Sequence, residues 1–184
     1  MMWLTAYHRH RLGNGGIVQV TIDGVTYVSH EDPVWRAENS HLAMVDLAPF
    51  DLQGMREQLW LRETVDDGEY EICCLPFYAY GLALGDVVGK SGSENVGTVI
   101  RKSGRRVLRI MFAEPRFQEG DSRAVLREVL DAAGLLSEWN GDRFIAIDVP
   151  DISVMQPIFD SVQAEIQNGT AFWEWGDSRG FAQA

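Results

Sequence analysis

The sequence lacks the long apolar segments that identify membrane-spanning or secreted proteins. No apolar run approaches the ~20 residues that a membrane helix requires. Residues 1–13 include basic side chains, but no apolar core of signal-peptide length follows them. We therefore expect a cytoplasmic protein without a membrane partner.

Cysteine is scarce: the chain has two, Cys73 and Cys74, and they are adjacent. Adjacent cysteines do not easily form an unstrained disulfide with each other, because bridge geometry requires converging side chains. We interpret them as neighbours in a strand, one facing the core and one facing away, with a reactive thiol as the alternative. Four histidines and these two cysteines do not have the spacing of a zinc site, so no metal site is predicted.

Recognised catalytic motifs are also missing. The sequence has no glycine-rich phosphate loop, Gly-x-Ser-x-Gly elbow, His-Glu-x-x-His pair or Walker lysine. The best acid–base cluster is His30 with Glu31 and Asp32, which we interpret as a turn anchored by Trp35. Asp86 follows a glycine at a strand start, where a carboxylate usually caps a turn. No catalytic residue and no cofactor are predicted, and an enzyme using His30, Asp32 or Asp86 is kept as an alternative.

Positive charge is in short supply. The chain has 16 Lys and Arg against 27 Asp and Glu, a net charge of −11, which argues against nucleic acid as a partner. Residues 113–184 hold 5 basic and 13 acidic side chains, a balance of −8. The basic residues of segment 101–109 lie around one predicted hairpin. A nucleic-acid patch is one interpretation of them. The chain's acidity favours the other, a solvated hairpin end that could face this acidic last third, in the same molecule or in a second copy.

Short alternating segments separated by turn residues fill residues 17–104 and predict a β-rich unit. Asp-Gly pairs at 23–24 and 67–68 are placed where hairpin turns need them. A further hairpin is expected between residues 97–102 and 105–112, around Ser103-Gly104. The other expected strands lie at 17–29 (a hairpin), 41–47, 57–64, 69–75 and from 86 onward.

The last third changes to helical periodicity. Apolar stripes over 125–133, ended by Gly134, and over 155–166, ended by Asn168-Gly169, predict two amphipathic helices. Strands are expected at 105–112, 137–140, 143–149 and 170–175. The order strand, helix, strand, strand, helix, strand predicts a ferredoxin-like (split βαβ) plait.

The predicted fold class is therefore α+β. A small N-terminal β-barrel or curled antiparallel sheet packs with a C-terminal ferredoxin-like plait. The strand starting at residue 105 could be shared between them. The expected organisation is a flexible N-terminus at 1–16, the β-rich half at 17–104, the plait at 105–176 and a tail at 177–184.

Residues 75–88, near the middle of the chain, combine three aromatics, two glycines, a proline and an acid among apolar residues. We interpret this stretch as a structural crossover of the β-rich half. It is also the place where a pocket is expected. The candidate pocket residues are Phe77, Tyr78, Tyr80, Asp86, His30 and Trp35.

Several of these motifs, in their order and spacing, resemble an uncharacterised bacterial family, a domain of unknown function similar to DUF4265, with a Gly-Asp-x-Val motif. The matching residues here are Gly85-Asp86-Val87-Val88. The resemblance covers roughly residues 25–175, supports the fold prediction and implies no activity. Segments 30–35, 59–60, 76–81 and 101–104 also resemble the family.

The leading functional hypothesis is a non-enzymatic protein-binding module that holds a partner with a basic surface. Its concrete form is an immunity or antitoxin-type protein that neutralises a basic bacterial toxin through the acidic C-terminal half. A small-molecule-sensing regulatory domain is the alternative, which a closed apolar pocket beneath Phe77, Tyr78 and Tyr80 would favour. Homodimer formation also stays open. The candidate binding residues are Asp148, Asp151, Asp160, Glu165, Trp173, Glu174 and Trp175.

Overall fold

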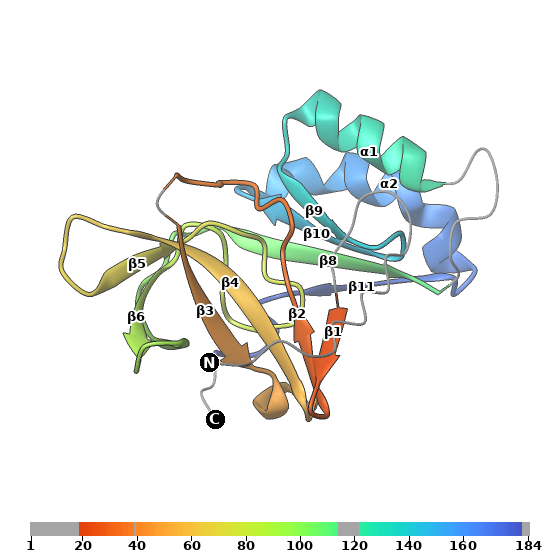
Figure 1. The fold of residues 1–184 in the computed structure, drawn as a ribbon. Helices are drawn as coiled ribbons and strands as arrows, with labels where there is room; N and C mark the ends of the chain where they lie inside the picture. The colour runs from red at the N-terminus through yellow and green to blue at the C-terminus, as the bar shows by residue number, and fades with distance from the viewer. Residues whose placement is uncertain (1–18, 39, 114–121, 182–184) are drawn as a thin grey trace.

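The computed structural model describes residues 19–38, 40–113 and 122–181, and these form a mixed α+β fold of two sheets and two main helices (Figure 1). The segment 1–16, expected to be flexible, lies outside the described residues, as does the end of the predicted tail at 182–184. In the ranges described, no helix is both long enough and apolar enough to cross a membrane.

The first sheet has seven strands in the order β1-β2-β4-β3-β7-β6-β5. Strand β4 also pairs with β5, so five of the strands pair in a ring and the sheet curls back on itself. The expected curled sheet is confirmed, but it is not wholly antiparallel, because β2 runs parallel to β4 and β3 parallel to β7. The bounds are β1 Gln19–Ile22, β2 Val25–Val28, β3 Ser40–Asp46, β4 Met55–Glu63, β5 Glu69–Ile72, β6 Val87–Ser91 and β7 Asn95–Arg101, with a 3-10 turn at Ala48–Phe50.

The hairpin between β1 and β2 forms as the sequence predicts. Asp23 and Gly24 both have positive φ, 50° and 80°, which is the conformation of a type I′ turn. Gly68, at the second Asp-Gly pair, also has a positive φ of 76° and connects β4 to β5, which pair antiparallel. Glycine and aspartate thus determine where these strands reverse direction.

The second sheet has four strands in the order β11-β8-β10-β9, and every neighbouring pair is antiparallel. Both long helices lie on one face of this sheet (Figure 1). The core between them contains buried apolar side chains of β8, β10, α1 and α2. The bounds are β8 Arg106–Phe112, α1 Ser122–Ala133, β9 Ser137–Asn140, β10 Phe144–Val149, a 3-10 turn at Ile152–Val154, α2 Met155–Gln167 and β11 Ala171–Trp175.

The hairpin predicted around Ser103-Gly104 does not form. Strand β7 pairs with β6 and β3 in the first sheet, whereas β8 pairs with β10 and β11 in the second, so no strand is shared. The backbone N–H of Ser103 donates to the Asp86 carboxylate at 2.8 Å instead of taking part in a hairpin turn. The chain therefore changes sheets at this point.

The face of the second sheet that the helices leave uncovered packs against the first sheet and the connection at 73–86. Val28, Phe77, Leu84, Val107 and Ala146 are buried in this contact. Within the connection, a Cβ at Gly81 would lie 2.1 Å from the backbone nitrogen of Phe181, so only glycine fits there. The crossover predicted at 75–88 thus lies between the two sheets.

Candidate functional site

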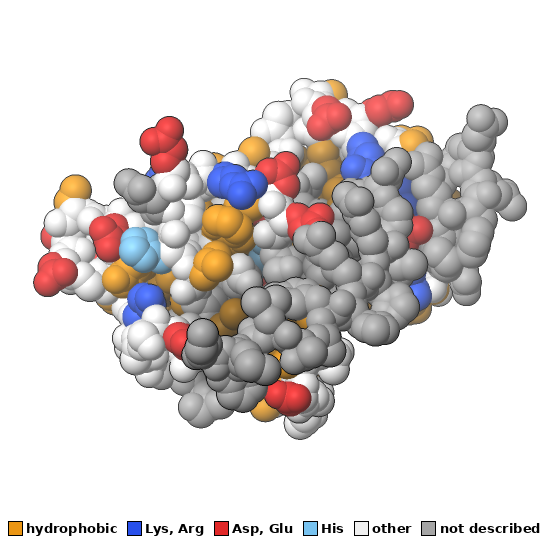
Figure 2. Space-filling view, viewed as in Figure 1, with side chains coloured by type: hydrophobic (Ala, Val, Ile, Leu, Met, Phe, Trp, Pro, Cys, Tyr) orange, Lys and Arg blue, Asp and Glu red, His pale blue; other side chains and the backbone are white. Residues whose placement is uncertain are grey.

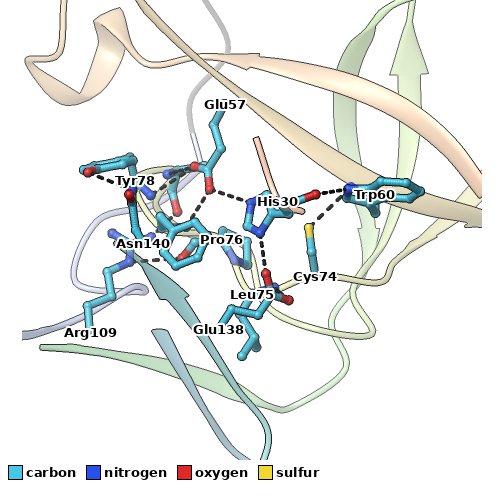
Figure 3. Close-up of polar contacts among 12 residues, drawn as sticks. His30, Glu57, Trp60, Cys74, Leu75, Pro76, Tyr78, Arg109, Glu138 and Asn140 are labelled. Atoms are coloured by element: carbon cyan, nitrogen blue, oxygen red, sulfur yellow. Dashed lines mark hydrogen bonds and ion pairs between the residues drawn. The ribbon is translucent and has the colours of Figure 1, made fainter. Parts of the chain in front are cut away.

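A buried polar cluster joins the two sheets through the side chain of His30 (Figure 3). The imidazole Nδ1 lies 2.5 Å from Oε2 of Glu138, and Nε2 lies 3.1 Å from Oε1 of Glu57. Phe77 stacks on the ring, with 4.6 Å between centroids. Because Glu57 belongs to β4 and Glu138 to β9, the histidine connects the first sheet to the second.

The Glu57 carboxylate also holds the 73–86 connection in place. It accepts hydrogen bonds from three consecutive backbone N–H groups: Phe77 at 2.5 Å, Tyr78 at 3.0 Å and Ala79 at 2.7 Å. Burial raises the pKa of Glu57, but hydrogen bonding and charge from His30, the Phe77 N–H and the charge of Arg109 lower it more, so the net shift is downward. Glu57 is therefore an ionised, fully buried carboxylate.

Glu138 fixes two loops at once. Its Oε1 accepts from the backbone N–H of Val34 at 3.1 Å and from that of Leu75 at 2.9 Å, while Oε2 faces His30. The loop after β2 and the 73–86 connection are thus both attached to strand β9. A single carboxylate of the second sheet positions two loops of the first half.

The two carboxylates favour the charged form of His30. Burial lowers the pKa of His30, but interactions with Cys74, Glu138 and Glu57 raise it well above its ordinary value. Both ring nitrogens then carry protons and donate to the two carboxylates. The cluster is closed to solvent, since His30 is 2% and Glu57 0% exposed. Its geometry indicates a structural role, which is to hold the two sheets together.

The cysteines differ from the prediction in one respect. Both Cys73 and Cys74 are fully buried, so neither faces away from the core. The reason is that strand β5 ends at Ile72, and both residues enter the connection between the sheets. Burial raises the pKa of Cys73 to about 11 and also raises that of Cys74, which keeps both as thiols at neutral pH.

Asp86 of the Gly-Asp-x-Val sequence is fully buried and caps the turn before β6. Its carboxylate accepts from the backbone N–H groups of Ala83 at 2.9 Å and Ser103 at 2.8 Å. The Lys102 ammonium group lies 2.8 Å away. This geometry matches the turn-capping interpretation of Asp86.

A hollow of about 290 Å³, here called the inter-sheet hollow, opens between the two sheets. Its two charged groups are paired with each other: Arg109 contacts Glu174 at 3.2 Å, and the Tyr80 hydroxyl also donates to Glu174, at 2.7 Å. The guanidinium also donates to the carbonyls of Pro76 and Ala79. The lining residues are Phe50, Leu52, Tyr78, Tyr80, Arg109, Met111, Phe144, Phe172, Trp173 and Glu174.

A second hollow of about 380 Å³, here called the helix-side hollow, lies between α2 and β11. Trp173 of β11 and Phe159 of α2 meet there edge to face, with centroids 4.9 Å apart. Asp160 is exposed at the same place and accepts a hydrogen bond from Gln156. The lining residues are Gln156, Phe159, Asp160, Gln163, Ile166, Gln167 and Trp173.

The structure separates the six predicted pocket residues. Tyr78 and Tyr80 line the inter-sheet hollow, whereas Phe77 and His30 are buried in the polar cluster. Trp35 lies beside Gly85 and under the guanidinium of Arg105, away from the hollow. Asp86 caps its own turn, so the predicted pocket corresponds to two residues of the aromatic stretch.

The predicted binding residues are also divided. Asp160 and Trp173 share the helix-side hollow, and Glu174 faces the inter-sheet hollow. Asp148 is buried and forms an ion pair with Arg105, so it does not belong to an exposed acidic surface. Asp151 caps the 3-10 turn before α2, Glu165 is half-buried on α2, and Trp175 is half-buried with Arg106 stacked 3.8 Å from its ring centroid.

The basic cluster at 101–109 is neutralised inside the molecule. Three of its arginines pair with acids of the last third, as the sequence led us to expect, and two basic residues pair within the first half. The pairs are Arg105–Asp148, Arg106–Asp177, Arg109–Glu174, Arg101–Glu69 and Lys102–Asp86.

Sequence reasoning missed Glu57, Glu138 and Arg109. Glu57 carried a signal, because it alternates with the apolar Leu59 and Leu61 and so falls on the inward face of its strand. Its partners were not identifiable, since they come from distant parts of the chain.

The fold and these sites define an α+β protein of two packed sheets, with no cluster of potential metal ligands among the residues described. The chain belongs to the family described as "Domain of unknown function (DUF4265)", which matches residues 57–174. The matched segment includes Glu57, Arg109 and Glu138 and begins after His30. The resemblance to this family that was inferred from the sequence is thereby confirmed for residues 57–174.

A solved structure has a similar fold. It is described as "Novel crystal structure of a hypothetical protein from Neisseria gonorrhoeae", with a TM-score of 0.54 and 16% sequence identity over 80% of this chain and 99% of that chain. At this identity the likeness concerns the fold alone. No curated protein matches the sequence.

Proposed function

We propose that this chain is a non-enzymatic protein-binding module that holds a partner with a basic surface through its C-terminal half. The observation that carries the proposal is the helix-side hollow, where the 44% exposed Trp173 lies beside the exposed acid Asp160. Tryptophan is enriched at the energetic centres of protein interfaces. An exposed aromatic group beside an acid suits a basic side chain with an apolar stem.

The charge distribution supports a basic partner. Arginines of segment 101–109 are committed to internal ion pairs, while acids on both helices remain exposed, including Asp131 and Asp160. Figure 2 shows acidic side chains over the helices at the top of the view. With a net charge of −11, such a surface attracts a basic protein over long range and accelerates association.

The concrete form of this proposal is an immunity or antitoxin-type protein of bacterial origin that works in the cytoplasm. It would neutralise a basic toxin, such as a nuclease, by covering the positive surface with which that toxin binds phosphates. Steering and coverage need no catalytic residue in the neutralising protein.

The proposal is tested by capture from the native host at two salt concentrations. We expect the wild-type chain to retain a protein with a pI above about 9 at low salt and to release it at high salt. The double variant Asp160→Asn, Trp173→Ala should lose that protein, whereas Glu128→Gln, with the same change of charge on α1, should keep it. A wild-type chain that retains no basic protein, or the same proteins as the double variant, would contradict the proposal.

The inter-sheet hollow favours a second candidate, a small-molecule-sensing regulatory domain. Tyr78 and Tyr80 line that hollow, and its volume of about 290 Å³ lies near the lower end of the usual range for ligand pockets. Narrowing the hollow with Met111→Trp should abolish a ligand-induced rise in Tm. The enzyme alternative has no comparable support. His30 and Asp86 are buried, and their polar atoms are occupied by hydrogen bonds, whereas Asp32 is exposed in the loop after β2.

We also infer the finer architecture of the two halves. The second sheet and its helices form a ferredoxin-like plait, which the strand order β11-β8-β10-β9 and the antiparallel pairing of all neighbours support. The first sheet forms a small barrel, which the ring of pairings among β4, β3, β7, β6 and β5 supports.

A further inference from the structure

Strand β11 lies at the edge of the second sheet and, within the part of the chain that the structure describes, pairs with β8 alone. The Ala113 N–H donates to the Thr170 carbonyl and the Gly176 N–H to the Val107 carbonyl, both at 2.8 Å. Even-numbered residues of this segment therefore direct their backbone groups toward β8. Because the direction of these groups alternates along a strand, the N–H and C=O of Trp173 point away from β8, in the plane of the sheet and beyond its edge.

The same edge has a hollow on each face. Phe172 points toward the first half and lines the inter-sheet hollow, and it is 52% exposed. Trp173 points toward α2 and lines the helix-side hollow, and it is also among the residues that line the inter-sheet hollow. A strand added beside β11 would direct its successive side chains alternately into these two hollows.

The two hollows differ in chemistry. In the inter-sheet hollow the charges of Arg109 and Glu174 are paired, and the other lining residues are aromatic or aliphatic, so a large uncharged apolar side chain fits best. In the helix-side hollow Phe159 and Trp173 provide an apolar wall and Asp160 an exposed carboxylate. That combination suits lysine or arginine, whose stem packs on the rings while the head faces the acid.

We propose that the partner binds as an extended segment that adds a strand to the edge of β11 that no other described strand occupies, with basic residues alternating with large apolar residues. This inference rests on the proposed function and specifies its mode of recognition. A second copy of the chain fits less well, because edge-to-edge pairing would bring the exposed acid Asp160 of both copies to one interface.

The first test uses a displayed library of random nine-residue peptides selected against the full-length chain. The expected result is enrichment of peptides in which Lys or Arg alternates with Phe, Leu, Ile or Trp. Scrambling an enriched peptide, at constant composition and charge, should weaken its binding at least about tenfold, because the alternation is lost. Absence of enrichment, or enrichment of acidic or non-alternating sequences, would overturn the proposal.

Backbone methylation of the peptide tests strand addition without changing the protein. Methylating the peptide nitrogens that face β11 should abolish binding, whereas methylating the alternate, outward set should leave affinity within about threefold. Equal tolerance of both sets would overturn strand addition. If that peptide still lost affinity on Asp160→Asn, the proposed basic-partner function would stand while the binding mode would fall.

Protein variants locate the site. Trp173→Ala should weaken peptide binding at least about tenfold and Asp160→Asn about threefold or more, with Glu128→Gln unchanged within about twofold as the matched control. Glu128 and Asp160 are exposed, so their variants should keep the Tm of the wild type. Trp173 also packs on Phe159, so Trp173→Ala should lower the Tm while the chain stays folded at the temperature of the binding measurement. Two results would overturn the assignment of this edge to another protein. One is that all three variants bind the peptide with equal affinity. The other is that the wild type sediments as a dimer and Trp173→Ala dissociates it.

Discussion

His30 and Glu138, which are 108 residues apart in sequence, lie 2.5 Å apart between imidazole Nδ1 and carboxylate Oε2. The histidine follows β2 of the first sheet and the glutamate belongs to β9 of the second. With Glu57 on the other ring nitrogen, this contact joins the two halves at a position closed to solvent. The relative placement of the sheets, and hence the inter-sheet hollow, depends on it.

Removing the charge of Glu138 should destabilise the chain strongly. In Glu138→Gln the imidazolium loses one of its two carboxylates and the amide cannot reproduce all three contacts, so we expect a loss of about 3 kcal/mol in the free energy of unfolding. Urea denaturation measures it. Glu128→Gln on the exposed face of α1 is the control and should stay within about 0.5 kcal/mol of the wild type; equal stabilities for the two variants would contradict the structural role of Glu138.

The stability should depend on pH through His30 in a defined direction. The folded-state pKa of His30 is raised above its ordinary value of 6.5, so its contribution is fully present below pH 6.5 and is lost as the pH rises through the raised pKa. The stability difference between the wild type and His30→Gln should therefore shrink as the pH rises from about 6 to 9. A difference that grows over this range, measured by urea denaturation, would show that the histidine is neutral in the fold.

The contribution of Glu57 to stability should depend on pH in the opposite direction to that of His30. Its pKa is lowered from the ordinary 4.5, so its contribution is present above pH 4.5 and is lost as the pH falls through the lowered pKa. Glu57→Gln should therefore unfold at lower urea concentration than the wild type at pH 7, and the difference should shrink as the pH falls below 4.5. Persistence of the full difference at pH 3 would contradict an ionised Glu57.

The cysteines should be unreactive in the native chain. Both are buried, and the pKa of Cys73 is raised to about 11, so the thiolate is rare at neutral pH. We expect no reaction with a thiol-exchange reagent such as DTNB at pH 7.5 until the chain unfolds in guanidinium, when two thiols per chain should react. Fast reaction of one thiol in the native state would instead favour a reactive cysteine.

Replacing Asp86 should lower the free energy of unfolding more than replacing Lys102, the lysine that pairs with it. Asp86→Asn replaces an acceptor of three hydrogen bonds by an amide with one acceptor oxygen, and about 2 kcal/mol or more should be lost. Lys102 is 54% exposed, so Lys102→Met should cost less than about 1 kcal/mol. Thermal or urea unfolding of the two variants gives the comparison, and the reverse order would contradict the turn-capping role.

Local signals allowed much of the architecture to be predicted from sequence. Asp23-Gly24 marks a turn because few other residues adopt two successive positive φ values, and the stripe ending at Gly134 marks α1. The change of sheet after β7 was not predictable, because it depends on a hydrogen bond from Ser103 to Asp86, 17 residues earlier. The position of Glu57 on the inward face of its strand could be recognised from sequence. Its pairing with His30 could not, because the two residues are distant in the chain.

The exchange rate of the Trp173 backbone amide tests the central claim most directly. We would measure amide hydrogen exchange of the full-length chain, free and saturated with the tightest-binding alternating peptide from the library. Strand addition predicts that the amide of Trp173, which points out of the sheet, becomes strongly protected, while amides of α1 do not change. Binding without protection at Trp173, or with protection confined to α1 or the first sheet, would contradict recognition of the partner at the edge of β11.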